Sequence, residues 1–252
     1  MQIENIIIEK NNLTKETKTQ ILRAVVTKSN ELARSEISKV DSVLFGRLFN
    51  IFLSKINKED ADFKDYNIPM TVLMSEKNRG GLYYDIINKQ SDKWLEVVAK
   101  IKINNDEIIK YPLFSKLKIN KRTNIITINI HRDLKPHLLQ LREHFTQYPI
   151  QEYLRLSTVK TQRLFELLSS WQSCLCFKID IEKLQDFLNC ETYHRKNFKF
   201  FRTRILEPAH REITQHTSLR YDWETEKHGR KVIAIKFTFK LPILEEYNIK
   251  NI

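Results

Sequence analysis

The stretch HRKNFKFFRTRILEPAHREI, residues 194–213, decides the fold of the second half of the chain. It has a helical pattern, and five Lys or Arg residues but no Asp or Glu stand between His194 and Arg204. Its apolar residues recur on one helical face, which we expect to pack on a domain core: Phe198, Phe201, Ile205, Ala209 and Ile213. Because Pro208 removes a backbone donor, we expect a kink or break just before it. The pattern predicts one long basic helix over residues 195–216.

The opposite face of this helix carries residue types that suit DNA bases. Arg pairs with two acceptors on guanine, Asn does the same on adenine, and a Thr methyl or an exposed Phe contacts the thymine methyl. The predicted base-contacting residues are Lys196, Asn197, Phe200, Thr203 and Arg204. The predicted phosphate contacts beside them are Arg195, Lys199 and Arg202. The alternative is a solvated basic helix that only covers a core.

Two strand-like segments follow the helix, residues 219–226 and 231–240, and the sequence KHGR joins them. Gly229 supplies the positive φ that a tight turn needs. Helices followed by a hairpin have the order of a winged helix-turn-helix, in which a helix enters the major groove and the hairpin, or wing, contacts DNA beside it. The wing residues that we expect to contact DNA are Lys227, Arg230 and Lys231. By itself, the segment fits an ordinary surface hairpin equally well.

The first half repeats this order of elements. Helical patterns over residues 13–56 and 82–101 precede two strand-like segments, 111–119 and 125–130, which the basic turn 120–124 joins. Six Lys or Arg and no acidic residue stand between Lys110 and Arg132. The residues of this first hairpin that we expect to contact DNA are Lys116, Lys118, Lys121 and Arg122.

The pattern predicts an α+β, helix-rich fold of two tandem winged-helix domains. A connecting helix over residues 134–148 and the helix-disfavouring Pro149 place the boundary. The domains are therefore residues 1–148 and 149–241, followed by a short tail, 242–252. In the first domain, Asp41 is a candidate helix cap and Arg79, Gly80 and Gly81 a turn.

Composition narrows the classes of function. A net charge of +12 and a pI near 9.5 favour a polyanionic partner, with nucleic acid first. No segment is long and apolar enough for a membrane span or a signal peptide, so we expect a cytoplasmic protein. Cys174, Cys176 and Cys190 lack zinc-site spacing and are interpreted as reduced, mostly packing thiols. We expect no metal and no cofactor.

Enzyme signatures are absent from the sequence. It has no Gly-rich phosphate loop, no GxSxG, no His-hydrophobic-His arrangement of a nickase and no clustered carboxylates of a two-metal nuclease. We therefore expect a non-enzymatic double-stranded DNA-binding protein. Two alternatives stay open, a winged-helix transcriptional repressor and a nuclease or relaxase.

Several stretches resemble one family, the RepB-like, iteron-binding plasmid replication initiators. They are KSNELARS (28–35), LKPHLLQLREHFTQY (134–148), LRLSTVKTQRLFELL (154–168), FKFFRTRILEPAHREI (198–213) and HGRKVIAIKFTF (228–239). The resemblance implies two winged-helix domains, of which the first also dimerises, and monomer binding to direct repeats at an origin. It further implies origin opening, autorepression by a dimer on an inverted repeat, and recruitment of host initiator and helicase proteins. The chain departs from the family at Phe165, where Tyr is frequent, and at Thr214, where Asn is common.

Overall fold

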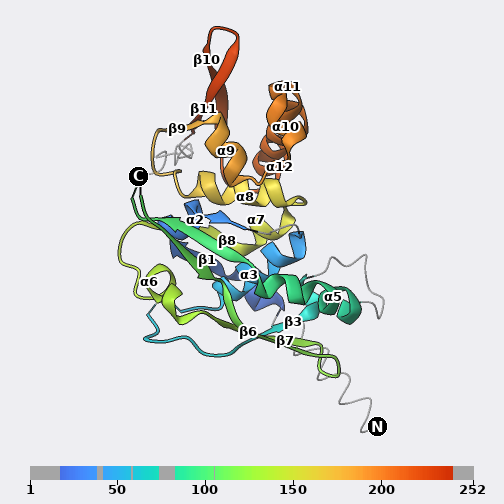
Figure 1. The fold of residues 1–252 in the computed structure, drawn as a ribbon. Helices are drawn as coiled ribbons and strands as arrows, with labels where there is room; N and C mark the ends of the chain where they lie inside the picture. Colours follow the sequence, from blue (N-terminus) through green and yellow to red (C-terminus); the bar gives the residue numbers. More distant parts are fainter. Residues whose placement is uncertain (1–17, 39–41, 58, 74–82, 105, 241–252) are drawn as a thin grey trace, which may run out of the picture.

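The computed structural model describes residues 18–38, 42–57, 59–73, 83–104 and 106–240 (Figure 1). The predicted cap Asp41 and the predicted turn at Arg79, Gly80 and Gly81 lie outside these residues. Among the described residues, no helix has the length and apolar character needed to cross a membrane. The molecule consists of two stacked parts, and the last third of the chain forms the part at one end (Figure 1).

The C-terminal part is a winged helix. Its antiparallel sheet has the strand order β10-β11-β9, and helices pack on it. Its elements, called the C-terminal unit below, are α8 (Val159–Ser169), β9 (Cys176–Asp180), α9 (Ile181–Phe187), α10 (Thr192–Lys196), α11 (Phe198–Phe201), the π-helical turn η3 (Arg202–Leu206), α12 (Glu207–His216), β10 (Tyr221–His228) and β11 (Lys231–Phe239). The predicted wing is the β10–β11 hairpin.

The N-terminal part repeats this topology. Its equivalent sheet has the order β6-β7-β3, which matches β10-β11-β9 strand by strand. The repeated elements, called the N-terminal unit, are α3 (Val43–Ser54), β3 (Tyr66–Pro69), α4 (Met70–Leu73), α5 (Tyr83–Leu95), β6 (Phe114–Asn120) and β7 (Ile125–Ile130). The prediction of two tandem winged helices is confirmed.

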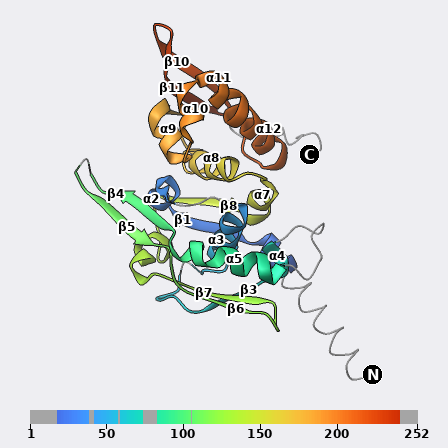
Figure 2. The ribbon, with the colours of Figure 1, turned by 45° about the vertical axis from the view of Figure 1, so that its right-hand side comes forward.

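Further elements surround the N-terminal unit. A hairpin of β4 (Val98–Lys102) and β5 (Ile108–Pro112) is inserted between α5 and β6, and it projects from the body (Figure 2). The others are β1 (Val25–Ser29), α2 (Asn30–Arg34), β2 (Glu36–Ile37), η2 (Arg132–Leu134), α6 (Lys135–Leu138), β8 (Phe145–Pro149) and α7 (Ile150–Arg155). No sheet of the described residues joins a strand of β1–β8 to one of β9–β11.

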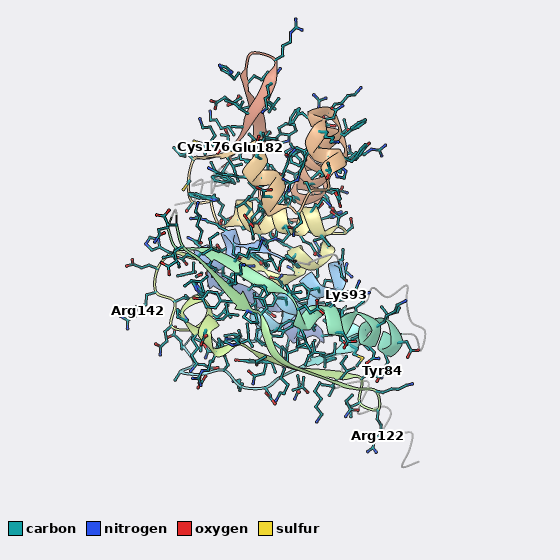
Figure 3. The ribbon with its side chains drawn as sticks, in the orientation of Figure 1. Tyr84, Lys93, Arg122, Arg142, Cys176 and Glu182 are labelled. Atoms are coloured by element: carbon teal, nitrogen blue, oxygen red, sulfur yellow. The ribbon has the colours of Figure 1, made fainter. Side chains whose placement is uncertain are left out.

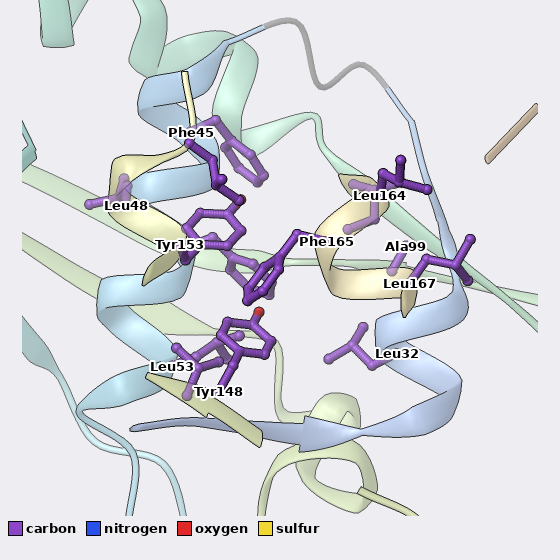
Figure 4. Close-up of a cluster of buried hydrophobic side chains, with 14 of the residues drawn as sticks. Leu32, Phe45, Leu48, Leu53, Ala99, Tyr148, Tyr153, Leu164, Phe165 and Leu167 are labelled. Atoms are coloured by element: carbon purple, nitrogen blue, oxygen red, sulfur yellow. The ribbon is translucent and has the colours of Figure 1, made fainter. Parts of the chain in front are cut away.

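Helix α8 lies between the two parts (Figure 2). It contacts α2 and α3 on one side and α12 on the other, and every residue from Thr161 to Ser169 is buried. The ring of Phe165 packs against the stacked rings of Tyr148 and Tyr153, with centroid distances of 5.1 Å and 6.4 Å (Figure 4). Helices α7 and α8 follow the predicted domain boundary at residues 148–149, and both still contact elements of the N-terminal part. The position of the boundary stays a prediction.

A buried ionic network fixes α8 to the N-terminal part. Glu166 accepts a hydrogen bond from the Lys28 ammonium at 2.7 Å and pairs with Arg163 at 2.8 Å. Asn50 and Tyr148 also donate to its carboxylate, each at 3.1 Å. Burial by itself raises the pKa of Glu166, but the two cations outweigh it and lower the pKa. Because the three ionic side chains are almost fully buried, each needs its partners to offset desolvation.

Two predictions of helix in the first half are wrong in part, because strands form within the predicted segments. The first helical pattern contains β1 instead, since Val25, Val26 and Thr27 are β-branched and pair with β8. The predicted connecting helix over residues 134–148 is only η2 and α6, and the chain then enters β8. Positive φ angles at Gln140 and His144 end helical geometry there. The strand pairing of β1 with β8, which joins distant segments, overrides local helical preference.

The third difference is the predicted helix over residues 82–101. Helix α5 ends at Leu95, and the alternating sequence VAKIK forms β4, which pairs with β5. In the second half, the predicted strands 219–226 and 231–240 lie within two residues of the bounds of β10 and β11. The predicted long basic helix differs from the structure.

Candidate nucleic-acid interface

The predicted long helix is broken at Asn197. This residue has an extended backbone, with φ −139° and ψ 109°, and its side-chain oxygen accepts a hydrogen bond from the backbone N–H of Lys199 at 2.9 Å. Asn197 is therefore the N-cap of a new helix that runs from Phe198 through η3 to His216. The break turns the basic segment into a short helix, α10, followed by the N-terminal turns of the longer helix.

Helical geometry changes again just before Pro208, as predicted. The backbone N–H of Glu207 donates to the carbonyl of Arg202, five residues earlier, so that η3 is a π-helical turn. The ring of Pro208 crowds the carbonyl of Arg204, four residues earlier, and Pro208 has no N–H to offer it. A wider turn relieves this crowding without ending the helix.

A groove of about 790 Å³ separates this helical segment from the C-terminal wing. The partly buried side chains of Phe198, Trp223 and Val232 line it and pack on the core. Its cations come from both walls: Arg195, Lys196 and Arg202 from the helical segment, and Lys227, Arg230 and Lys231 from the wing. The groove is therefore a positively charged cleft between helix and wing, with the acidic residues Glu182 and Glu224 also on its lining.

Four predicted contact residues have partners inside the protein. The guanidinium of Arg195 donates to the carbonyl of Cys190 at 2.8 Å and pairs with Asp186 at 2.5 Å. The side chain of Thr203 donates to the carbonyl of Lys199, and Phe200 stacks on Tyr193 with 4.8 Å between ring centroids. The fourth is Asn197, whose oxygen is used by the cap. These bonds compete with the DNA contacts predicted for them.

The other predicted residues of the C-terminal unit are exposed. Lys196, Lys199 and Arg204 have no side-chain hydrogen bond or ion pair with another described residue. The same holds among the described residues for Lys227 and Arg230 at the wing tip. Lys231 lies 3.9 Å from Glu182, and Arg202 lies 2.9 Å from Glu207. Most of the positive charge here is free to meet an anion.

The predicted basic hairpin of the first half is the β6–β7 wing, except that Tyr111 and Pro112, predicted in its first strand, belong to β5 and pair with β4. Lys116 pairs with Asp65 at 2.6 Å, and its hydrogen bond is the main cause of the lowered pKa of Asp65. Lys121 lies 5.1 Å from the ring centroid of Tyr84, so the wing contacts α5. Lys118 and Arg122 are exposed. Figure 3 shows Arg122 at the end of the molecule opposite to the β10–β11 tip.

Sequence reasoning missed two parts of the candidate interface. Helix α5 is the topological equivalent of the basic helix, and it exposes Asn88 and Lys89 next to Asp85 and Asp92. The other is Glu207, the ion-pair partner of Arg202. The repeated element order could have identified α5 once the β6-β7-β3 pairing was known. No local signal marks Glu207.

The sequence interprets the three cysteines as packing thiols, and the structure agrees for one of them only. Cys190 is buried, and burial raises the pKa of its thiol to about 11. Cys174 and Cys176 are exposed, so the interpretation is wrong for these two. They stand where the chain leaves α8 and starts the edge strand β9, whose outer residues face solvent. Among the described residues, no group of three or more His, Cys, Asp and Glu side chains could hold a metal ion.

Comparison with known proteins gives two family matches and a structural likeness. Residues 25–169 match the family model described as "Initiator Replication protein, WH1", and residues 180–239 match the one described as "Initiator Rep protein, WH2". A solved structure described as "Crystal structure of Pi initiator protein in complex with iteron DNA" has a TM-score of 0.69 and 19% sequence identity. That likeness covers 86% of this chain and 97% of the other, and it shows the shared fold.

Proposed function

The chain belongs to the initiator replication protein family, and on this premise we propose that it binds double-stranded DNA sequence-specifically at a replication origin. The observation that carries the proposal is the cationic groove between the helical segment and the C-terminal wing. A winged helix places a helix in the major groove and its wing on the backbone or the minor groove beside it. The DNA strand between these two contacts would then lie in the cationic groove.

Within the C-terminal unit, we assign different tasks to the exposed cations. Arg204 follows the N-terminal turns of the longer helix, and its guanidinium is free for the acceptors of guanine. Lys196 and Arg202 line the groove and suit phosphates, as do Lys227, Arg230 and Lys231 on the wing. Lys196, which the sequence predicts as a base contact, is thus reassigned to phosphate, and the exposed Lys199 keeps its predicted phosphate contact. Asn197 and Thr203 contribute to recognition only if their internal bonds are exchanged for DNA contacts.

The N-terminal unit would contact a second stretch of the same duplex. The tips of the two wings point to opposite ends of the molecule (Figures 1 and 2). A duplex that meets both wings would therefore run along the long axis of the protein. Lys118 and Arg122 would contribute phosphate contacts there, whereas Lys116 and Lys121 already have partners on the protein.

The sharpest test is titration of the protein on DNA taken from around its own gene. Duplexes that carry repeated segments from that region should bind more tightly than scrambled duplexes of equal length. Specific DNA-binding proteins exceed their non-specific affinity by about 10³ or more. Equal affinity for repeat and scrambled DNA at physiological salt would overturn sequence-specific binding.

The finer proposal follows the solved Pi initiator, which was crystallised with iteron DNA. We propose that monomers of this chain bind direct repeats, promote origin opening and recruit host initiator and helicase proteins. A dimer would bind an inverted repeat and repress the protein's own gene. Sedimentation with and without an inverted-repeat duplex tests the dimer. Monomers alone at every concentration, with and without the duplex, would remove autorepression from the proposal.

A non-catalytic role is part of the proposal. Two DNA-binding units in tandem favour an initiator over a simple repressor, which usually needs only one such unit per protomer. A nuclease or relaxase would convert supercoiled plasmid to nicked or linear forms when Mg²⁺ or Mn²⁺ is added. We expect the plasmid to stay supercoiled, and cleavage by the pure protein would contradict the proposal.

A further inference from the structure

We propose that Glu207 is a positioning residue for DNA binding: it holds Arg202 for a phosphate of the strand in the cationic groove. The proposal rests on the proposed function, because it requires that the groove binds duplex DNA. It assigns a stabilising role to an acidic residue on the face that meets a polyanion. The sequence predicts Arg202 as a phosphate contact, and no local pattern in it indicates an acidic partner for this residue.

The π-helical turn brings the two residues together. Residues five apart in an α-helix point about 140° away from each other, since each residue turns by about 100°. In the wider turn of η3, the backbone N–H of Glu207 donates to the carbonyl of Arg202. The side chains also meet, with 2.9 Å between Arg202 Nε and Glu207 Oε1. Backbone and side chain thus link the same two residues.

The ion pair leaves the Nη1 and Nη2 groups of the Arg202 guanidinium available for a phosphate. Its closest contact is on the Nε side, and no hydrogen bond or other ion pair of the Arg202 guanidinium is found among the described residues. Arg202 itself lines the cationic groove. The planar Nη1 and Nη2 groups match two oxygens of a phosphate. Glu207 therefore fixes the orientation of the fork before DNA arrives.

Two opposing effects decide whether removal of the Glu207 carboxylate weakens or strengthens DNA binding. Electrostatic repulsion alone says that loss of Glu207 should strengthen DNA binding. Ordering a free, rotamer-rich side chain at an interface costs about 0.5–1.5 kcal/mol, which is about 2- to 10-fold in affinity. Both carboxylate and guanidinium are about half exposed, so water and salt weaken the repulsion from one carboxylate. The positioning effect should therefore prevail.

The test uses the full chain and two duplexes, one with the origin repeat and one scrambled. Glu207→Ala should bind both duplexes about 2- to 10-fold more weakly than the unaltered protein. Glu224→Ala is the matched control, because Glu224 lines the same groove but pairs with Lys236. It should bind equally well or more tightly. Thermal unfolding of each variant checks that the fold is kept.

A double substitution separates positioning from a structural role. In an Arg202→Ala background there is no guanidinium to hold, so adding Glu207→Ala should cause no further loss. A further loss in that background, or tighter binding by the single Glu207→Ala variant, would overturn the proposal. A loss restricted to the repeat duplex would overturn the phosphate assignment. If the unaltered protein bound neither duplex, the proposed function itself would fail, which is a distinct result.

Discussion

The two winged-helix units have the same strand order and the same order of helices and strands, yet the helices that precede their wings differ in charge. The stretch from His194 to Arg204 in the C-terminal unit has five Lys or Arg and no acidic residue. The equivalent helix α5 alternates in sign, with Asp85, Lys89, Asp92 and Lys93. Topology alone therefore does not decide which unit reads DNA.

The two wings also differ in how much of their positive charge is unpaired, and the C-terminal wing has more. Lys227 and Arg230 at the C-terminal wing tip have no partner among the described residues. On the N-terminal wing, Lys116 pairs with Asp65 and Lys121 lies against Tyr84. A lysine ammonium with a partner must leave it, or share it, when it meets a phosphate, whereas the guanidinium of Arg202 can keep Glu207 on its Nε side and bind a phosphate through Nη1 and Nη2. We infer that the C-terminal unit supplies most of the affinity and specificity, and that the N-terminal unit supports it.

The largest expected effect concerns the joint between the units. Glu166→Ala leaves Lys28 and Arg163 buried without their carboxylate and should lower the free energy of unfolding by about 3–5 kcal/mol. Urea denaturation measures this change. Glu143→Ala is the control, because Glu143 is exposed and its single ion pair with a described residue is a 4.0 Å contact with His144; it should change stability by less than about 0.5 kcal/mol. A loss below about 1 kcal/mol for Glu166→Ala would show that α8 does not depend on the network.

The next effect compares equivalent helices. Arg204→Ala should cost about 1–3 kcal/mol on the repeat duplex and relax base preference at one or two positions. Lys89→Ala, in α5, should cost less than about 1 kcal/mol. Titrations on repeat and scrambled duplexes measure both. Equal losses on the two duplexes for Arg204→Ala would mean that the helix holds DNA without reading it.

The phosphate contacts beside Arg204 should behave in another way. Arg202→Ala or Lys199→Ala should weaken binding to repeat and scrambled duplexes alike, because phosphates carry no sequence information. Each should also reduce the salt slope by roughly one contact. A loss confined to the repeat duplex would place these residues against bases. Comparing the Arg204 variant with the Arg202 and Lys199 variants therefore distinguishes base contacts from phosphate contacts within one helix.

The smallest effect compares the wings through salt dependence. Each phosphate contact contributes about −0.9 to the slope of log affinity against log salt. Replacing Lys227 and Arg230 together with Ala should make the slope shallower by about 1.8. Replacing Lys121 and Arg122 should change it by about 0.9, since Lys121 lies on Tyr84. A larger change for the N-terminal pair would reverse the comparison. For the unaltered protein, a slope shallower than about −3 would contradict a footprint of two units.

The sequence by itself determined the tandem winged-helix architecture and the position of the charged surfaces. Apolar periodicity placed Phe201, Ile205 and Ile213 on the buried face of the basic helix, and all three are buried. Turn residues and alternating strands placed both wings. These features are local, because they depend on residues within one or two turns of a helix or across one hairpin.

Only the tertiary structure decided which of those charges are free. Strand β1 forms because β8, more than a hundred residues away, pairs with it, and no local pattern contains that partner. The internal bonds of Arg195 and Asn197 depend on where α9 ends and where the next helix begins. The pairing of Arg202 with Glu207 depends on a π-helical turn that a uniform 100° rotation cannot reproduce. Charge can be counted along the chain, but its partners are set by backbone geometry and distant contacts.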